Sequence, residues 1–88
     1  MIGVGIDVAK SKSMVAILSD DGEIIKEPFE IANTESGLEY LCSIIGELTD
    51  KVYCVVESTG AYHIPVVSYL QENEIFVSVI NPLIIKKY

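Results

Sequence analysis

Residues 2–8 alternate between branched apolar side chains and small or acidic ones. The apolar set is Ile2, Val4, Ile6 and Val8, and the other set is Gly3, Gly5 and Asp7. This period of two predicts a β-strand with one buried face and one nearly bare face. Because glycine has no side chain, another group can approach the backbone of this strand closely, and Asp7 ends the bare row.

The composition indicates one small folded domain with an acidic surface. The chain has 88 residues, of which 50% are hydrophobic and 22% are charged, so it is too apolar to be a disordered chain. Thirteen acidic residues against 6 basic ones give a formal net charge of −7 at pH 7. This balance disfavours a general phosphate-binding surface, which needs Lys and Arg. It allows a nuclease-type site, where carboxylates hold metal ions that face the phosphate.

The chain carries no sign of export or of membrane insertion. No apolar run approaches the roughly 20 residues that span a bilayer. Met1 leads directly into the first strand without a basic leader, so we expect no signal peptide, no membrane partner and a cytoplasmic location. Cys42 and Cys54 lie within apolar patterns and are expected to be reduced core thiols. His63 is the sole histidine and cannot build a zinc site alone.

The apolar periodicity and the turn residues predict an α/β domain. The expected strands are 2–8, 13–19, 23–31, 52–57 and 75–80, with one helix opening at 33–36 and stopping at 49–51 and another at 62–72. Ser36 and Glu39 fit a capping box at the first helix, with Asn33 and Thr34 as competing caps. Pro28 predicts that 23–31 is an edge strand. The near-continuous apolar run at 52–57 predicts a central strand covered on both faces, and 83–88 is expected to begin a further helix.

Two carboxylates are candidates for a metal site. If strands 2–8 and 52–57 lie side by side and parallel, their carboxyl ends meet at one edge of the sheet, where open α/β sheets bind ligands. Asp7 lies near the end of the first strand and Glu57 at the end of the second. Two close carboxylates repel unless a cation lies between them, and hard oxygen ligands favour Mg²⁺ or Mn²⁺. The alternative is that Asp7 simply forms the turn that follows its strand.

Three motifs together resemble one protein family. They are GIDVAK at 5–10, ESTGAYH at 57–63 and NP at 81–82. In this combination they resemble the amino-terminal part of the DEDD transposases of the insertion-sequence one-ten type, relatives of the Piv DNA invertases. The resemblance implies a RuvC-like domain of ribonuclease H-like fold with four metal-binding acids. Asp7 matches the first of these acids and Glu57 the second.

The same resemblance implies that residues 1–88 are an incomplete part of a longer recombinase. The chain stops before the last two acids and before the carboxy-terminal domain with its proposed nucleophilic serine. The parent is expected to cleave and transfer DNA strands with two Mg²⁺ or Mn²⁺ ions. Its expected partners are the element ends and target DNA and, in some family members, a guide RNA. The 88 residues alone are expected to be inactive and to bind these ions weakly or not at all.

Five further residues are candidates for supporting the metal site or contacting nucleic acid: Lys10, Thr59, Gly60, Tyr62 and His63. Each also has a plain structural explanation. Thr59 and Gly60 fit a tight strand-to-helix turn, and Tyr62 fits a core or rim position. Lys10 fits a solvated hairpin turn, and His63 fits an exposed first helical turn.

Two other functions remain open from the sequence. Actin-like ATPases and sugar kinases also open with a glycine-rich strand ending in Asp, although the turn at 9–12 lacks the small glycine and threonine residues that cradle phosphate there. The second alternative is a non-catalytic acidic interaction module. Because an incomplete domain leaves apolar surface exposed, we also expect self-association, for instance through an open sheet edge.

Overall fold

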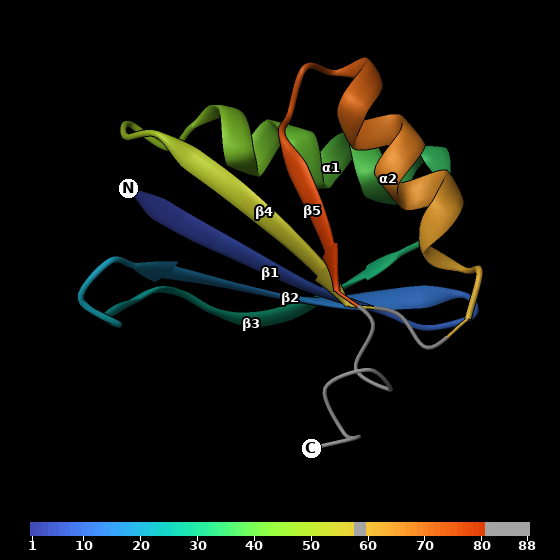
Figure 1. Cartoon of the computed structure of the whole chain (residues 1–88), viewed down its shortest axis with the longest axis horizontal. Helices are drawn as coiled ribbons and strands as arrows, with labels where there is room; N and C mark the ends of the chain where they lie inside the picture. Colours follow the sequence, from blue (N-terminus) through green and yellow to red (C-terminus); the bar gives the residue numbers. More distant parts are fainter. Residues whose placement is uncertain (58–59, 81–88) are drawn as a thin grey trace.

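A computed structural model of the chain shows one mixed sheet with two helices packed on it (Figure 1). It describes residues 1–57 and 60–80. The strands are β1 (Ile2–Val8), β2 (Lys12–Ser19), β3 (Ile24–Ala32), β4 (Val52–Glu57) and β5 (Val77–Ile80), and the helices are α1 (Glu35–Gly46) and α2 (His63–Glu72). This mixed five-stranded α/β arrangement agrees with the fold class expected from the sequence, and it is consistent with a ribonuclease H-like fold.

The sheet has the strand order β3-β2-β1-β4-β5. β1 pairs antiparallel with β2 and parallel with β4, so the first strand lies in the middle of the sheet. β2 pairs antiparallel with β3, and β4 pairs parallel with β5. β3 is an edge strand, as Pro28 predicts. Proline has no backbone N–H to donate to a neighbouring strand, and at an edge this position can face solvent instead.

Both helices cover the same face of the sheet (Figure 1). The connections β3–α1–β4 and β4–α2–β5 progress in the same direction across the sheet, and right-handed crossovers in one direction place their helices on one side. The expectation that β4 is covered on both faces is therefore wrong. Cys54 and Val56 are buried under the helices, whereas Tyr53 and Glu57 are exposed on the opposite face.

The core lies between the sheet and the two helices. Alternate residues of β1, β2 and β4 point into it and meet the apolar stripes of α1 and α2. Its buried members include Ile2, Val4, Ile6, Val8, Val15, Ile17, Leu38, Leu41, Cys54, Val56, Val66 and Leu70. The period of two in residues 2–8 thus predicted the buried face of β1 correctly.

Helix α1 begins two residues earlier than a capping box at Ser36 would require. Its N-cap is Thr34, whose hydroxyl oxygen accepts a hydrogen bond from the Gly37 backbone N–H at 3.2 Å. The expected box of Ser36 and Glu39 is not used, and the competing cap Thr34 takes its place. Gly37, in the first turn of the helix, lies tightly against the backbone at the end of β3.

Strand β5 is shorter than the sequence indicated. The chain leaves α2 through Asn73 and then Glu74, which has a positive φ of 63°. The Ile75 N–H still donates to the Leu70 carbonyl, so the helix ending extends into the region expected to be strand. The first strand residue is consequently Val77. The expected strand break at 81–82 and the expected helix at 83–88 lie outside the described residues.

The two cysteines are free thiols, as expected, with Cys54 buried and Cys42 half-buried. Burial, and to a lesser extent the neighbouring Cys42, raises the pKa of Cys54 from 9.0 to about 11. The unfolded chain therefore loses this proton before the folded chain does, and stability falls as pH rises through this range. We expect a loss of about 2–3 kcal/mol between pH 9 and pH 11 from this group.

The measurement is urea unfolding at several pH values, with Cys54→Ala as the control. The alanine variant is less stable at all pH values because it leaves a cavity. Its stability is nevertheless expected to vary less between pH 9 and pH 11. An equally steep pH dependence in Cys54→Ala would contradict the assignment to this thiol.

Candidate functional site

Asp7 and Glu57 lie next to each other at the carboxyl ends of the two central parallel strands. They are register partners in the β1–β4 ladder, and both side chains belong to the face that the helices leave open. Neighbouring strands are about 4.8 Å apart, so paired residues on one face have side chains that can reach a common point. Both residues are exposed. Within residues 1–57 and 60–80, neither carboxylate takes part in a salt bridge.

The two carboxylates border a shallow depression of about 320 Å³ on the open face. Its floor is the bare row of β1, and its sides come from the neighbouring strands. The lining residues are Gly5, Ile6, Asp7, Met14, Ala16, Pro28, Val55 and Glu57. Carboxylate oxygens are the ligands that Mg²⁺ and Mn²⁺ prefer, so the donor set fits a hard divalent cation. In the described part of the chain these acids are a pair, since no group of three potential metal ligands occurs there.

The turn that follows Asp7 is fixed by a small polar network. Ser13 is buried and donates its hydroxyl proton to the Asn33 side-chain oxygen at 2.6 Å. The Asn33 side-chain amide donates in turn to the Ala9 carbonyl at 2.9 Å. The Asn33 backbone N–H donates to the Ser11 carbonyl, also across the turn. The β1–β2 turn is therefore tied to the end of β3 just beyond the acid pair.

Asn33→Ala is expected to destabilise the chain by about 1–3 kcal/mol, because it leaves the buried Ser13 hydroxyl without its acceptor. Urea unfolding measures the effect. Ser13→Ala combined with Asn33→Ala provides the check, since removing both groups removes the unsatisfied hydroxyl. The double variant is expected to lose less stability than the sum of the two single variants. Strict additivity of the two losses would show that the two side chains do not interact.

Comparison with protein families gives a match over nearly the whole chain. The family model of DEDD transposases of the IS110 type, described as transposase, matches residues 4–88. The chain belongs to this family. The match includes both strands that carry the acid pair, so the resemblance seen in the sequence motifs is confirmed. No curated protein sequence matches this transposase chain significantly.

Solved structures share the fold of the transposase chain at low sequence identity. Pelota from Archaeoglobus fulgidus has a TM-score of 0.62 and 18% identity, covering 90% of this chain and 26% of its own. A ROK family glucokinase from Streptomyces griseus has a TM-score of 0.60 and 16% identity, covering 92% of this chain and 33% of its own. The transposase chain thus spans about a quarter to a third of these proteins. At such identities the similarity concerns the fold alone.

Of the other candidate residues that the structure describes, none lines the depression beside the acid pair of the transposase chain. Lys10 is exposed in the β1–β2 turn, and Tyr62 is exposed just before α2. His63 begins α2, and its Nδ1 lies 3.0 Å from the Gly60 carbonyl oxygen. A carbonyl can only accept, so Nδ1 carries the proton and the ring is held in a local turn. Thr59 lies outside the described residues.

Sequence reasoning missed the contribution of Ser13 and considered Asn33 only as a helix cap. A polar residue at the start of the inward row of β2 was the available signal, because a buried hydroxyl requires a partner. Tyr53 was also missed, since its place in an apolar run indicated burial rather than exposure on the open face. Neither helix in residues 1–57 and 60–80 is both long enough and apolar enough to cross a bilayer.

Proposed function

We propose that this chain supplies two of the acidic ligands of a metal-dependent DNA strand-transfer site in a longer transposase. The observation that carries the proposal is the register pairing of Asp7 with Glu57 at the carboxyl ends of β1 and β4. Family membership supports the reaction class, and the exposed carboxylates on an open face leave room for a cation and a phosphate.

In this proposal Asp7 and Glu57 hold Mg²⁺ or Mn²⁺ through their carboxylate oxygens. Bound divalent ions would stabilise the charge that develops on the attacking and leaving oxygens of a phosphodiester. The contribution of the chain's own residues is to fix the two carboxylates on rigid, centrally paired strands. Gly5, the preceding residue on the same face of β1, has no side chain to crowd the approach to Asp7. The Ser13–Asn33 network holds the turn that follows.

The remaining parts of the proposed site come from outside residues 1–88. The last two acids of the family set would complete the metal ligands, so the present chain is proposed to be an incomplete ribonuclease H-like domain that is inactive alone. DNA is the proposed substrate, and a guide RNA is a further proposed partner. The proposed location is the cytoplasm. Lys10, Tyr62 and His63 border the site in sequence and are proposed as nucleic-acid contacts, together with Thr59 and Gly60.

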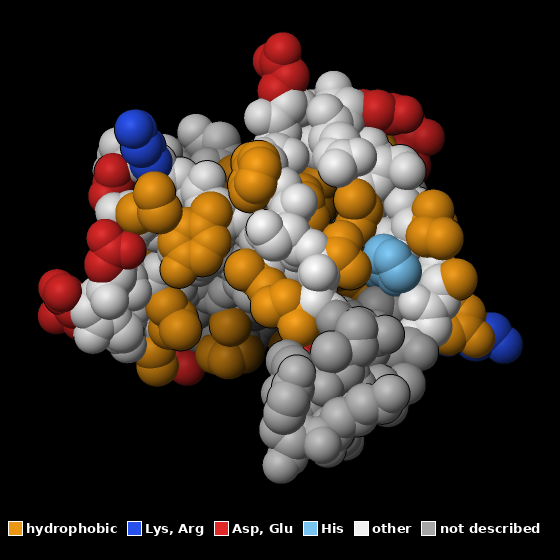
Figure 2. Space-filling model, in the orientation of Figure 1, with side chains coloured by type: hydrophobic (Ala, Val, Ile, Leu, Met, Phe, Trp, Pro, Cys, Tyr) orange, Lys and Arg blue, Asp and Glu red, His pale blue; other side chains and the backbone are white. Residues whose placement is uncertain are grey.

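Self-association is proposed as a property of the isolated chain. Figure 2 shows hydrophobic side chains across the middle of the view, over β4 and β5, with acidic side chains around the rim. Phe76 is 72% exposed and Val79 is 48% exposed, and among the described strands β5 is the last of the sheet on this side. An apolar open edge is a template for pairing with another strand. A monomeric sedimentation profile at high protein concentration would count against this property.

The test of the proposed function is a DNA excision and integration assay of the transposase that contains this chain. Asp7→Asn and Glu57→Gln should each abolish strand transfer while leaving binding to the element ends in place. Asp21→Asn, in the exposed β2–β3 hairpin, is the matched control and should remain active. Full activity of Asp7→Asn would refute the proposed role. ATP binding without DNA-end binding would favour the kinase-like alternative, whose fold is shared.

A further inference from the structure

The turn between β1 and β2 is fastened to the end of β3 by Asn33. The Asn33 side-chain amide donates to the Ala9 carbonyl oxygen at 2.9 Å, and its backbone N–H donates to the Ser11 carbonyl oxygen at 3.0 Å. Within the turn, the Ala9 N–H donates to the Lys12 carbonyl oxygen at 3.0 Å. Asn33 therefore holds the turn on both sides of Lys10, and the bond to Ala9 is the one that depends on its side chain.

The side chain of Asn33 is itself held in a fixed orientation. Ser13 is only 1% exposed, and its hydroxyl donates to the Asn33 Oδ1 atom at 2.6 Å. Because Oδ1 accepts this bond, the amide NH₂ group faces the Ala9 carbonyl, which can only accept. A fully satisfied network of this kind is rigid. The turn is thus bound through Asn33 to the buried start of β2, and a side chain sets its position relative to the sheet.

Lys10 lies in the middle of this turn and its side chain is exposed. Lys12, where β2 begins, has its ammonium 3.4 Å from the Glu30 carboxylate on β3, so its charge is shared. Within residues 1–57 and 60–80, Lys10 has no such ion pair. In a chain of formal charge −7, Lys10 is a positive charge that a phosphate can reach without displacing a carboxylate.

Lys10 lies at the same edge of the sheet as the acid pair. It follows Asp7 by three residues, which span at most about 11 Å. Because β1 and β4 are parallel, Glu57 ends at this edge too. Lys10 does not line the depression beside the two carboxylates. Its ammonium is therefore placed for a phosphate that neighbours the reacting phosphodiester, and lysine binds phosphate as a point charge.

We propose that Asn33 is a positioning residue for DNA binding, which holds the turn so that Lys10 contacts a backbone phosphate next to the reacting one. The proposal rests on the proposed function, because that function supplies the DNA. Phosphate contacts fix the position of a strand on a protein. A turn that is already rigid loses little conformational freedom on binding, so more of the attraction between ammonium and phosphate contributes to affinity. Without the Asn33 amide, the Lys10 contact loses part of this advantage.

The experiment measures the affinity of the transposase that contains this chain for duplex DNA of the element end, at several salt concentrations. Loss of one phosphate contact lowers the slope of log affinity against log salt by about 0.9 in magnitude, which equals about an eightfold weakening at 0.1 M relative to 1 M salt. We expect this result for Lys10→Gln. For Asn33→Ala we expect a weakening of about two- to eightfold at 0.1 M salt.

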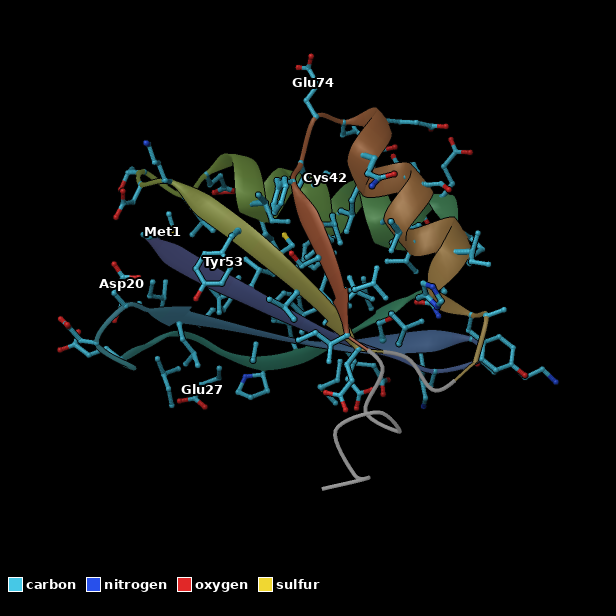
Figure 3. The ribbon with its side chains drawn as sticks, in the orientation of Figure 1. Met1, Asp20, Glu27, Cys42, Tyr53 and Glu74 are labelled. Carbon is cyan, nitrogen blue, oxygen red and sulfur yellow. The ribbon has the colours of Figure 1, made fainter. Side chains whose placement is uncertain are left out.

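Lys51→Gln is the matched control. It removes the same charge from the opposite end of the sheet, where Lys51 precedes β4 and its carbonyl accepts from the Ile2 N–H. Figure 3 labels Met1 and Asp20 at this end, and the Met1 amino group lies 2.9 Å from the Asp20 carboxylate. Lys51→Gln should leave both the slope and the affinity unchanged.

A double-variant comparison separates positioning from a general loss of structure. Once Lys10 is replaced by glutamine, Asn33→Ala should weaken binding no further, because no charge remains to be positioned. Combining Ser13→Ala with Asn33→Ala removes the unsatisfied buried hydroxyl and so protects the test against misfolding; this pair should bind DNA as weakly as Asn33→Ala. An unchanged slope for Lys10→Gln would overturn the proposal, as would additive losses for Lys10→Gln and Asn33→Ala.

These readouts are separate from those of the metal site. Asp7→Asn is expected to abolish strand transfer while binding to the element ends persists. An unchanged slope for Lys10→Gln together with an inactive Asp7→Asn would therefore overturn the positioning role of Asn33 alone. A failure of the unmodified transposase to bind the element ends would overturn both proposals.

Discussion

Replacing Gly37 with alanine is expected to destabilise the chain by about 3 kcal/mol or more, at the upper end of overpacking effects. An ideal Cβ at this position would overlap the Ala32 carbonyl oxygen and lie 2.9 Å from its carbonyl carbon. These are backbone atoms, so no flexible side chain can move aside. Relief requires that α1 shift away from the end of β3, which also weakens the packing of Leu38 and Leu41 in the core.

Urea unfolding monitored by circular dichroism measures this loss. Gly46→Ala is the control, because it lies in the same helix and an added Cβ there meets nothing within 4 Å. Alanine has a higher helix propensity than glycine, so Gly46→Ala is expected to be neutral or to stabilise by up to about 1 kcal/mol. Equal effects of the two substitutions would show that α1 does not pack against Ala32 as described.

Asp7→Asn is expected to weaken Mn²⁺ binding to the chain at least about tenfold, because the amide is neutral and a poor ligand for a hard cation. Isothermal titration calorimetry measures the affinity. Asp7 is exposed and has no salt bridge in the described part of the chain. The substitution should therefore change the free energy of unfolding of the chain by no more than about 0.5 kcal/mol. The two measurements together separate loss of a ligand from loss of the fold.

Two controls sharpen this result. Glu57→Gln should weaken binding by a similar factor, whereas Asp21→Asn in the β2–β3 hairpin should leave the affinity unchanged. If Asp7→Asn and Glu57→Gln each remove part of one site, the double variant should bind little more weakly than either single variant. If each single variant instead removes one of two binding events and leaves the other with unchanged affinity, the carboxylates hold two separate weak sites rather than one shared ion.

Much of the central sheet was predictable because its residues follow a strict physical pattern. The alternation in residues 2–8 predicted which face of β1 is buried, and the crossover argument predicted that Asp7 and Glu57 meet at one edge. Pro28 predicted the edge position of β3 because proline cannot donate a ladder hydrogen bond. These features depend on local sequence and on general rules of connection, so a single sequence suffices to find them.

Other features depended on tertiary context. The run at 52–57 is equally compatible with a strand covered on one face or on both, and the crossover handedness decides between them. Asn33, Thr34 and Ser36 all fit a helix cap in the sequence, and the structure uses Thr34, whose hydroxyl accepts from the Gly37 N–H. The late start of β5 depended on the left-handed conformation of Glu74. None of these is encoded in the periodicity of the sequence.

The most direct test of the proposed site is a crystal structure of the chain soaked with Mn²⁺. Anomalous scattering locates the ion independently of any assumption about its ligands. We predict one manganese peak at the carboxyl ends of β1 and β4, coordinated by carboxylate oxygens of both Asp7 and Glu57. Manganese bound elsewhere, such as at the exposed acids of the β2–β3 hairpin, with these two carboxylates turned apart, would contradict the shared metal site.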